Sequence, residues 1–279
     1  MGATVELFGV DGSHYVLAGD GAGDDGIYLG TDPQGLYDSP VTVTSKSGAF
    51  EIGGKPTKVT RRIREVMLPL GAYAYTPDDW AEADSKIRKA FDYEVDPWDP
   101  NATPTRLRVT TDESGSRDLF LLMTESPVMD LSTDPHNYEH SLLPVVCAAH
   151  QPDWFEPPVI SPVHWSGETV PGELPGTSGA GTVWIENPTP LPMMHTWVIS
   201  GQGTVALPDF SWTGPKYARV PGVDLASGKD DSERMLTLTP LTEADGGGAV
   251  VEVDRMKIPI RNKIGSNIAG RMGGRRLLY

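Results

Sequence analysis

The most strand-like part of the chain is Thr57-Lys58-Val59-Thr60-Arg61-Arg62-Ile63-Arg64-Glu65-Val66-Met67-Leu68-Pro69-Leu70. Val59 and Ile63 share one parity, whereas Val66, Leu68 and Leu70 share the other. Because side chains alternate between the two faces of a strand, this change of parity predicts either a β-bulge near Arg64-Glu65 or two strands that meet there.

Three arginines, Arg61, Arg62 and Arg64, crowd the same stretch. One interpretation is a solvated edge strand whose charges prevent aggregation. The other is an edge that meets acidic neighbours in a ring. The sequence leaves both open, and the three arginines are candidate contacts to a subunit or partner.

A helix is predicted directly after this stretch. Thr76 is suited to the N-cap, Pro77 to the first helical position, and two aspartates follow where the helix dipole favours them. Apolar residues then recur at helical spacing, and the amphipathic stripe predicts packing on the N-terminal sheet. That stripe consists of Trp80, Ala83, Ile87, Ala90 and Phe91.

Short strands are predicted through the rest of the chain. The 31 glycines and 25 prolines are spread throughout and favour short strands joined by turns. At the start, Asp11-Gly12 suits a two-residue type I′ hairpin turn in which both residues have positive φ. The other strand candidates are Ile27–Leu29, Val41–Thr44, Thr105–Thr110, Leu119–Met123, Leu142–Ala149, Thr182–Glu186, His195–Ser200, Val205–Leu207, Ala218–Val220, Met235–Leu238 and Ala249–Val253.

A proline-rich junction around Pro157 predicts a domain boundary. The fold class is therefore expected to be mainly β, with an N-terminal β-sandwich or barrel carrying one α-helix and then a second β-sandwich. The expected domains are residues 1–157, residues 158–256 and a basic C-terminal extension, residues 257–279, in which no strand pattern is evident.

Charge is unevenly distributed along the chain. The net charge is −15, yet the segment from Arg255 to the end has seven Lys or Arg and no acid. An acidic body argues against general affinity for DNA or RNA. The basic segment either lies against a neighbouring protein or is a solvated terminus, and for the first case we single out Arg271, Arg275 and Arg276.

No catalytic or metal-binding motif is evident in the sequence. The histidines are scattered, and the chain has no Gly-x-Ser-x-Gly elbow, His-Glu-x-x-His pair or phosphate-binding loop. The acidic loop Gly19–Gly26 lacks the core of a calcium loop. The single cysteine, Cys147, lies in an apolar run and is interpreted as a buried core residue. We predict no enzymatic activity, no cofactor and no metal.

Neither a membrane span nor a secretory leader is predicted. Five tryptophans lie in or beside the second half. Trp184 and Trp197 fall in strand-like runs and are assigned to the core, whereas Trp165 and Trp212 fall in loops and are candidate contact residues.

Together these patterns resemble the distal tail proteins of siphophages. The first half ends at His150-Gln151-Pro152-Asp153-Trp154-Phe155, an aromatic-proline segment of the kind that often closes the family's first domain. The second half has Trp184-Ile185-Glu186-Asn187-Pro188-Thr189-Pro190-Leu191-Pro192 and then Trp197-Val198-Ile199-Ser200-Gly201, which is similar to the opening of the family's galectin-like domain. The details resemble minor tail proteins of actinobacteriophages.

This resemblance implies a concrete role. The protein would be a homo-oligomer, a hexameric ring in the virion tail tip assembled in the host cytoplasm. The N-terminal domain would continue the tail tube, and the galectin-like domain would hold receptor-binding or side-fibre proteins. Its other partners would be the tail tube protein and a tail-tip or hub protein, and the genome would pass through the lumen without specific binding.

Three alternatives remain open. The first is another tube or tip subunit of the tail. The second is a carbohydrate-binding or receptor-binding β-sandwich, because tryptophans outside the core can bind sugars. The third is a hydrolase of the cell envelope, for which sequence cannot reveal two carboxylates facing across a cleft.

Overall fold

The computed structural model describes residues 2–48, 52–96, 99, 101–161, 179, 181, 183, 185–186, 193–208, 235–252 and 258–273. The chain divides into two compact units, Met1–Ile160 and Ser161–Tyr279. Each unit has its own buried core. The functional roles of the predicted domains, residues 1–157, 158–256 and 257–279, stay predictions.

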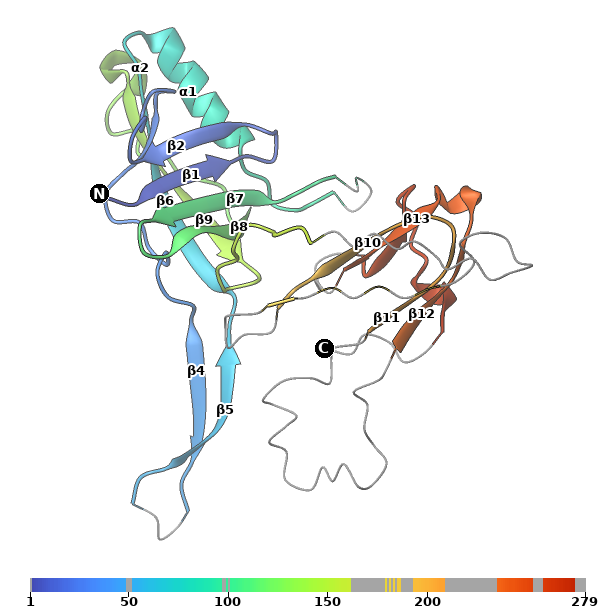
Figure 1. The fold of residues 1–279 in the computed structure, drawn as a ribbon. Helices are drawn as coiled ribbons and strands as arrows, with labels where there is room; N and C mark the ends of the chain where they lie inside the picture. Colours follow the sequence, from blue (N-terminus) through green and yellow to red (C-terminus); the bar gives the residue numbers. More distant parts are fainter. Residues whose placement is uncertain are drawn as a thin grey trace, which may run out of the picture. The chain divides into compact units, whose positions relative to one another are not determined.

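The first unit is built on one seven-stranded antiparallel sheet (Figure 1). The order of the strands is β2-β1-β7-β8-β9-β6-β3, and every neighbouring pair is antiparallel. The strands are β1 (Thr4–Phe8), β2 (His14–Ala18), β3 (Ile27–Leu29), β6 (Arg64–Tyr73), β7 (Thr105–Thr111), β8 (Gly115–Met123) and β9 (His140–Ala149).

The sheet folds around a single core. Strand β8 pairs with β7 from Gly115 to Leu121 and with β9 only through Leu122 and Met123, so the sheet turns a corner there. Side chains from both sides of that corner, including Leu107 and Leu68, pack into one cluster of buried residues. The result is the nearly closed barrel that the sequence predicts.

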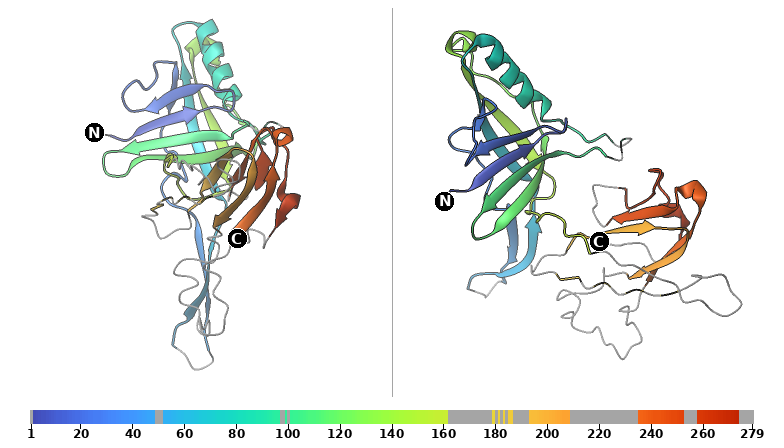
Figure 2. Two further views of the ribbon diagram at one scale, coloured as in Figure 1. Left: turned by 45° about the vertical axis from the view of Figure 1, so that its right-hand side comes forward. Right: turned by 45° about the horizontal axis from the view of Figure 1, so that its top comes forward.

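The strand-like stretch from Thr57 to Leu70 belongs to two strands. Strand β5 (Lys55–Arg61) pairs with β4 (Val41–Lys46) in a separate two-stranded sheet. After Arg62 and Ile63 the chain enters β6, which pairs with β9 and β3. We call the β4–β5 hairpin, residues 41–62, the arm, because Figures 1 and 2 show it projecting from the body of the unit. The predicted change of parity therefore marks a junction of two strands and not a bulge.

Helix α1 (Pro77–Lys89) follows β6 as predicted. The Thr76 side chain accepts a hydrogen bond from the Asp79 amide, and the predicted apolar stripe is buried in the core. At its C-terminal end, the Ala90 carbonyl accepts hydrogen bonds from the Val10 amide at 3.0 Å and the Thr105 hydroxyl at 2.8 Å. In both views of Figure 2 the helix lies at the end of the unit opposite the arm. A four-residue helix, α2 (Pro135–Tyr138), is additional to the single helix expected.

The first hairpin differs from the predicted two-residue turn. Only Gly12 has positive φ, at 81°, and the Gly9 amide donates to the Ser13 carbonyl at 2.9 Å. The connection therefore spans Gly9 to Ser13. The Asp11 side chain accepts a hydrogen bond from the Ser13 amide, which stabilises this longer loop without requiring positive φ at Asp11.

The described part of the second unit contains two three-stranded sheets, with orders β10-β13-β14 and β11-β12-β15. Leu207, Leu238, Val251 and Ile260, drawn from strands of both sheets, share one core. This arrangement is a small β-sandwich, and the mainly β fold predicted for the chain is confirmed. The elements are β10 (Thr196–Ser200), β11 (Gly203–Pro208), β12 (Met235–Leu241), η3 (Glu243–Asp245), β13 (Gly248–Glu252), β14 (Ile260–Asn262), η4 (Ala269–Arg271) and β15 (Met272–Gly273).

Two details of the second half need correction. Strand β14 pairs with β13, and Ile260 and Ile268 are buried in the core, so the chain after Lys257 does contain strands that complete the sandwich. The described residues 183, 185 and 186 are not in a strand, contrary to the candidate Thr182–Glu186. The candidate Ala218–Val220 lies outside the described residues.

Candidate functional site

Arg64 is an internal residue of the first unit, not a surface contact. Its residue exposure is 1%, and its guanidinium donates to the carbonyl oxygens of Gly35 at 2.7 Å, Leu36 at 3.0 Å and Pro152 at 3.0 Å. It also lies over the Trp154 ring, 5.4 Å from the ring centroid. Burial lowers the pKa of Arg64, while nearby acids oppose that shift. The predicted role of Arg64 as a subunit contact is therefore wrong, because its donors are used to join three segments of its own unit.

Arg61 and Arg62 lie at the base of the arm and are exposed. The Arg61 guanidinium forms an ion pair with Asp153, which also accepts a hydrogen bond from the Ser39 hydroxyl at 2.8 Å. This places the predicted aromatic-proline segment beside the arm base. Both arginines remain candidate contact residues.

The remaining predicted contacts lie in the second unit. Trp165, Trp212, Arg275 and Arg276 are outside the described residues. Arg271 donates to the Asp245 carboxylate at 2.8 Å, so its charge is at least partly neutralised within its own unit.

Asp245 forms the polar centre of the second unit. The Asn262 side chain donates to it at 3.1 Å, and the Thr242 amide donates at 3.1 Å. These hydrogen bonds, with that from Arg271, lower the pKa of Asp245 to about 2. The cluster fixes the position of η3 against β14, and its geometry is that of a structural network.

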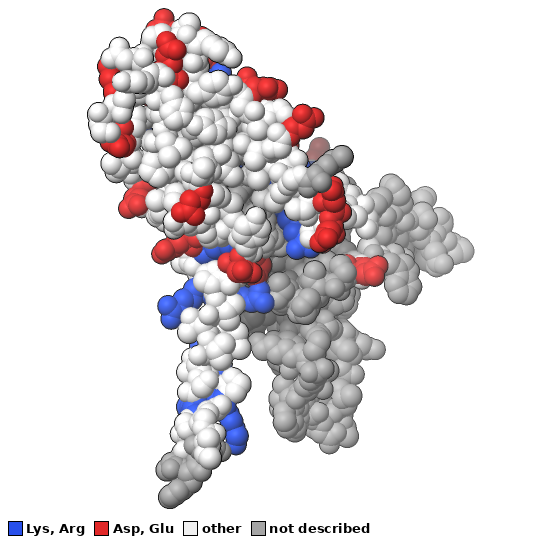
Figure 3. All heavy atoms as spheres, turned by 90° about the vertical axis from the view of Figure 1, so that its left-hand side faces the viewer, with Lys and Arg blue, Asp and Glu red and all other residues white. Residues whose placement is uncertain are grey.

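The arm is exposed and basic. Its residues include five Lys or Arg and one Glu, whereas the rest of residues 1–160 has seven Lys or Arg against 25 Asp or Glu. Figure 3 shows Lys and Arg on the arm and its base, with Asp and Glu spread over the body above it. One molecule thus carries two surfaces of opposite charge.

One face of the arm is also apolar. In the β4–β5 register Val41 lies opposite Arg61 and Val43 opposite Val59, so these side chains share a face. Val41 is 51% exposed, Val43 53% and Val59 63%. Sequence reasoning missed this face, although the alternation of Val with Thr and Lys in both strands could have revealed it.

A second apolar surface lies on the outer side of the main sheet. Because Leu68, Leu143 and their alternate neighbours point into the core, the residues between them point outward. Tyr28 lies flat on this surface, where a Cβ at Gly71 would come within 2.2 Å of its ring. We call this surface the β6–β9 face and define it by Tyr28, Met67, Tyr73, Leu142, Pro144 and Val146, which are all partly or fully exposed.

Aromatic contacts and acidic residues border the β6–β9 face. The Tyr28 hydroxyl is 2.5 Å from Nε2 of His140, and the Tyr28 and Tyr73 rings meet edge to face. The Tyr73 amide donates to the carbonyl of Gly26, the last residue of the acidic loop Gly19–Gly26. Gly23 of this loop lies beside the Tyr73 ring, so the exposed Asp24 lies toward the tyrosine end of the face.

The outer side of β1, β7 and β8 has a different character. Arg108 forms two hydrogen bonds to Asp118, at 2.7 Å and 2.9 Å, and this contact raises the pKa of Arg108. Arg106 lies 4.0 Å from the centroid of the Phe8 ring, which stacks on His14. The charges here are paired along the sheet, so this side is polar and nearly self-neutralised.

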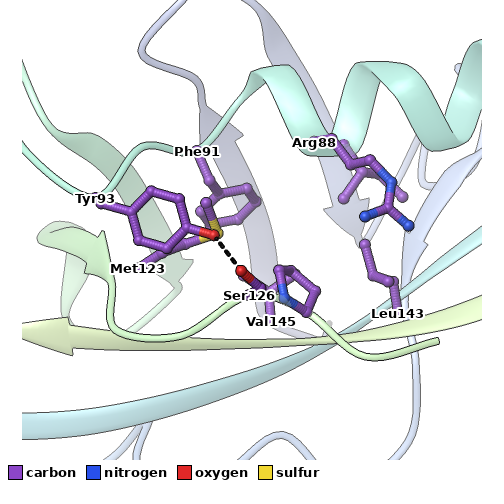
Figure 4. Close-up of a pocket in the computed structure, with 9 residues that line it drawn as sticks. Arg88, Phe91, Tyr93, Met123, Ser126, Leu143 and Val145 are labelled. Carbon is purple, nitrogen blue, oxygen red and sulfur yellow. Dashed lines mark hydrogen bonds between the residues drawn. The ribbon is translucent and has the colours of Figure 1, made fainter.

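A small pocket of about 260 Å³ lies beside helix α1 (Figure 4). Its walls are mainly apolar, with Phe91, Met123 and Val145 among them. The polar groups in view are the Tyr93 and Ser126 hydroxyls, which are 3.0 Å apart, and Arg88, which pairs with Asp84. The lining residues provide no acid–base pair.

Metal-binding clusters and reactive thiols are absent from the described ranges. Those ranges hold no group of three or more His, Cys, Asp or Glu that could bind a metal ion. Burial raises the pKa of Cys147 to about 12, which leaves its thiol unreactive at neutral pH. Among the described helices, none is long and apolar enough to cross a membrane.

The comparisons with known proteins agree on one class of protein. No protein-family model matches the chain. Two minor tail proteins named Gp27, from Mycobacterium phages L5 and D29, are each 29% identical to it over 97% of this chain and 85% of theirs. The chain is similar to phage minor tail proteins over nearly its whole length.

A solved structure has a similar fold. A chain in the structure of the phage p2 baseplate in its activated conformation superposes with a TM-score of 0.55 at 7% identity, covering 98% of this chain and 89% of that one. The predicted resemblance to minor tail proteins of actinobacteriophages is confirmed. The similarities indicate a structural protein of a phage tail or baseplate.

Proposed function

We propose that the chain is a ring-forming subunit of the phage tail tip, of the distal tail protein type. The observation that carries this proposal is the similarity to phage minor tail proteins along 97% of the chain. In this proposal the first unit builds a hexameric ring that joins the tail tube protein to a tip or hub protein. The second unit anchors receptor-binding or side-fibre proteins.

Features of the first unit support a role in assembly. Its charges separate into a basic arm and an acidic body, and it carries two exposed apolar surfaces, the valine face of the arm and the β6–β9 face. Exposed apolar surfaces are typical of sites that other proteins cover. The buried charged residues Arg64, Asp118 and Asp245 are used in structural networks, which supports a structural role.

The remaining contacts belong to the same proposal. Arg61 and Arg62 would meet a neighbouring subunit, and Trp165, Trp212, Arg275 and Arg276 would meet partner proteins. The protein would be a virion component assembled in the host cytoplasm. Its acidic body would let the genome pass through the ring without binding, because like charges repel.

Electron microscopy tests the proposal directly. Purified protein is imaged as single particles, and virions are labelled with an antibody against this chain. We expect ring-shaped averages with a central hole and label at the tail tip. Absence of the chain from purified virions would refute the proposal. Label along the tail tube would favour the alternative of a tube subunit.

A further inference from the structure

We infer that residues 151–155, which we call the strap, hold the base of the arm, so that opening of the arm and release of the strap are coupled. The strap follows β9 and is partly buried against the first unit. Residues 158–161 beyond it are exposed, and the chain continues from them into the second unit. The inference concerns a single molecule and does not depend on the proposed ring.

The Asp153 carboxylate of the strap contacts the chain on both sides of the arm. Ser39, two residues before β4, donates its hydroxyl to Oδ1 of Asp153 at 2.8 Å. Arg61, the last residue of β5, forms an ion pair with the same oxygen. The Arg61 side chain is 42% exposed, so the ion pair alone is weak, but the bond from Ser39 adds to it. One side chain of the strap therefore joins the entry and the exit of the arm.

The backbone of the strap adds contacts on the entry side. The Pro152 carbonyl lies 2.7 Å from the Ser39 hydroxyl, which shares its one proton between this carbonyl and Asp153. The same carbonyl accepts a hydrogen bond from the Arg64 guanidinium at 3.0 Å. Because Arg64 also donates to Gly35 and Leu36, the strap, the segment before the arm and the start of β6 meet at one side chain.

The far end of the strap is fixed to the body of the unit. Phe155 exchanges two backbone hydrogen bonds with Asp118 of β8, at 2.7 Å and 2.9 Å, and its ring centroid lies 5.9 Å from that of Phe120. Trp154 packs against the core and under the Arg64 guanidinium. The strap therefore connects the base of the arm to the barrel.

The arm itself has few contacts that would hold it in position. In β4 and β5, Thr42 and Thr60 are half-buried, and every other residue is exposed. A two-stranded hairpin is marginally stable alone in water, so local opening of the arm should require little free energy. The contacts at its base are then a large part of what keeps it closed.

Coupling of this kind acts in both directions. If the strap stabilises the closed arm, the closed arm stabilises the docked strap by the same free energy. A protein that covered the arm would therefore tighten the strap. A displacement of the connector that lifted the strap would in turn release the arm. In this way the fold links events at the arm to the start of the connector between the two units.

Hydrogen exchange of the purified full chain, resolved to single amides, tests the first direction. The reporter is the Arg62 amide, which donates to the Pro40 carbonyl at 3.1 Å across the base of the arm. Asp153→Ala removes both side-chain bonds to the arm base and should lower the protection factor of this amide about tenfold. Adding Arg61→Met to Asp153→Ala should lower it no further, because both substitutions remove the same ion pair.

The second direction is the more specific test, because a purely local role of Arg61 in the arm would not affect it. The reporter is the Phe155 amide, which donates to the Asp118 carbonyl on β8. Arg61→Met, a substitution in the arm, should lower the protection factor of this strap amide by about two- to fivefold.

Matched controls remove charges from exposed residues next to the same contacts. Glu156→Gln lies just beyond the strap, and Lys58→Met lies on β5. Neither should change the two protection factors by more than about twofold. The Gly12 amide in the first hairpin turn is an internal reference and should be unchanged in every variant. If Asp153→Ala does not fold, Asp153→Asn replaces it; it keeps an acceptor for Ser39 and should lower Arg62 protection by about two- to fivefold.

Two results would overturn the inference. The first is unchanged protection of Arg62 when Asp153 is replaced, or of Phe155 in Arg61→Met. The second is an equal fall at Arg62, Phe155 and Gly12, because the substitutions would then loosen the whole unit. Either result would leave the proposed role in the phage tail untouched, since the measurement compares variants of the purified chain and does not require a ring.

Discussion

Strands β5 and β6 are separated by only two residues, yet they have opposite environments. In β6, Val66, Leu68 and Leu70 are completely buried, and the strand has a partner on both sides. In β5, no residue is buried, and its one partner is β4. Two neighbouring strands of similar strand propensity thus differ in side-chain exposure, because β6 lies within a sheet and against a core and β5 does not.

The difference shows what strand alternation can and cannot indicate. A valine at every second position signals a face to be covered, whether by the same chain or by another. For β6 the cover is the rest of the barrel. For the arm, under the proposed function, the cover would be another protein of the assembly, and in the single chain its valines are exposed.

The largest expected contrast is in thiol reactivity. Cys147 on β9, the neighbour of β6, has a pKa of about 12, whereas an exposed cysteine titrates near 8.5. At pH 7.5 the thiolate fraction of Cys147 is therefore lower by roughly a thousandfold. In a Val43→Cys variant, the thiol introduced at position 43 should react quickly with a thiol reagent. Cys147 should react only when the protein unfolds. Equal rates at both sites would show that the barrel opens as readily as the arm.

The next largest contrast is in the free energy of unfolding that is lost when a side chain of β6 or of the arm is truncated. Leu68→Ala should lower the free energy of unfolding by about 2–5 kcal/mol, because it removes packing from a fully buried site. Val43→Ala in the isolated chain should change it by no more than about 0.5 kcal/mol. Urea denaturation measures both. A large loss for Val43→Ala would mean that the arm is covered in the monomer.

A smaller contrast is expected between two arginines. Arg64→Met should destabilise the first unit by about 2–3 kcal/mol, because buried carbonyl oxygens of Gly35 and Leu36 lose their donor. Arg61→Met breaks one largely exposed ion pair and should cost less than about 1 kcal/mol. Thermal or urea unfolding of the matched pair would distinguish them. Similar losses would contradict the internal role assigned to Arg64.

The smallest expected effect is on the pH dependence of the stability of the second unit. Its polar centre, Asp245, is buried, as Arg64 is in the first unit. The pKa of Asp245 is about 2 in the folded protein and near 3.9 when unfolded, so its stabilising effect is complete above pH 4 and is lost as pH falls toward 2. Asp245→Asn should make the stability of the second unit less dependent on pH in this range. Hydrogen exchange of β13 amides between pH 2 and 5 measures it, with Glu243→Gln as the control. An unchanged pH profile for Asp245→Asn would contradict this assignment.

Local signals in the sequence predicted much of the first unit. The cap at Thr76 and the stripe from Trp80 to Phe91 specify α1 because both depend on residues within a few positions of each other. Strand β3 has the bounds of the predicted strand, Ile27–Leu29. The many predicted short strands, with one helix that has a single apolar stripe, indicated the barrel.

Long-range relations could not be predicted in the same way. Arg64 is a strand residue with a charged side chain, and only the approach of Gly35, Leu36 and Pro152 makes it internal. The apolar β6–β9 face depends on register between β6 and β9, which one sequence does not specify. Similarly, β14 joins the sandwich through pairing with β13, although its three residues have no alternation of their own.

The C-terminal end of α1 has a consequence for how the first unit folds. Its Ala90 carbonyl is capped by Val10, which precedes the helix by dozens of residues, and by Thr105, which follows it. A nascent chain can form the first turns of the helix early, since Thr76 and Asp79 are local. The last turn is completed only when the first hairpin and β7 arrive, and such non-local steps are slow. The helix therefore links the beginning and middle of the chain into one cooperative folding event, and truncation before Thr105 should leave its end frayed.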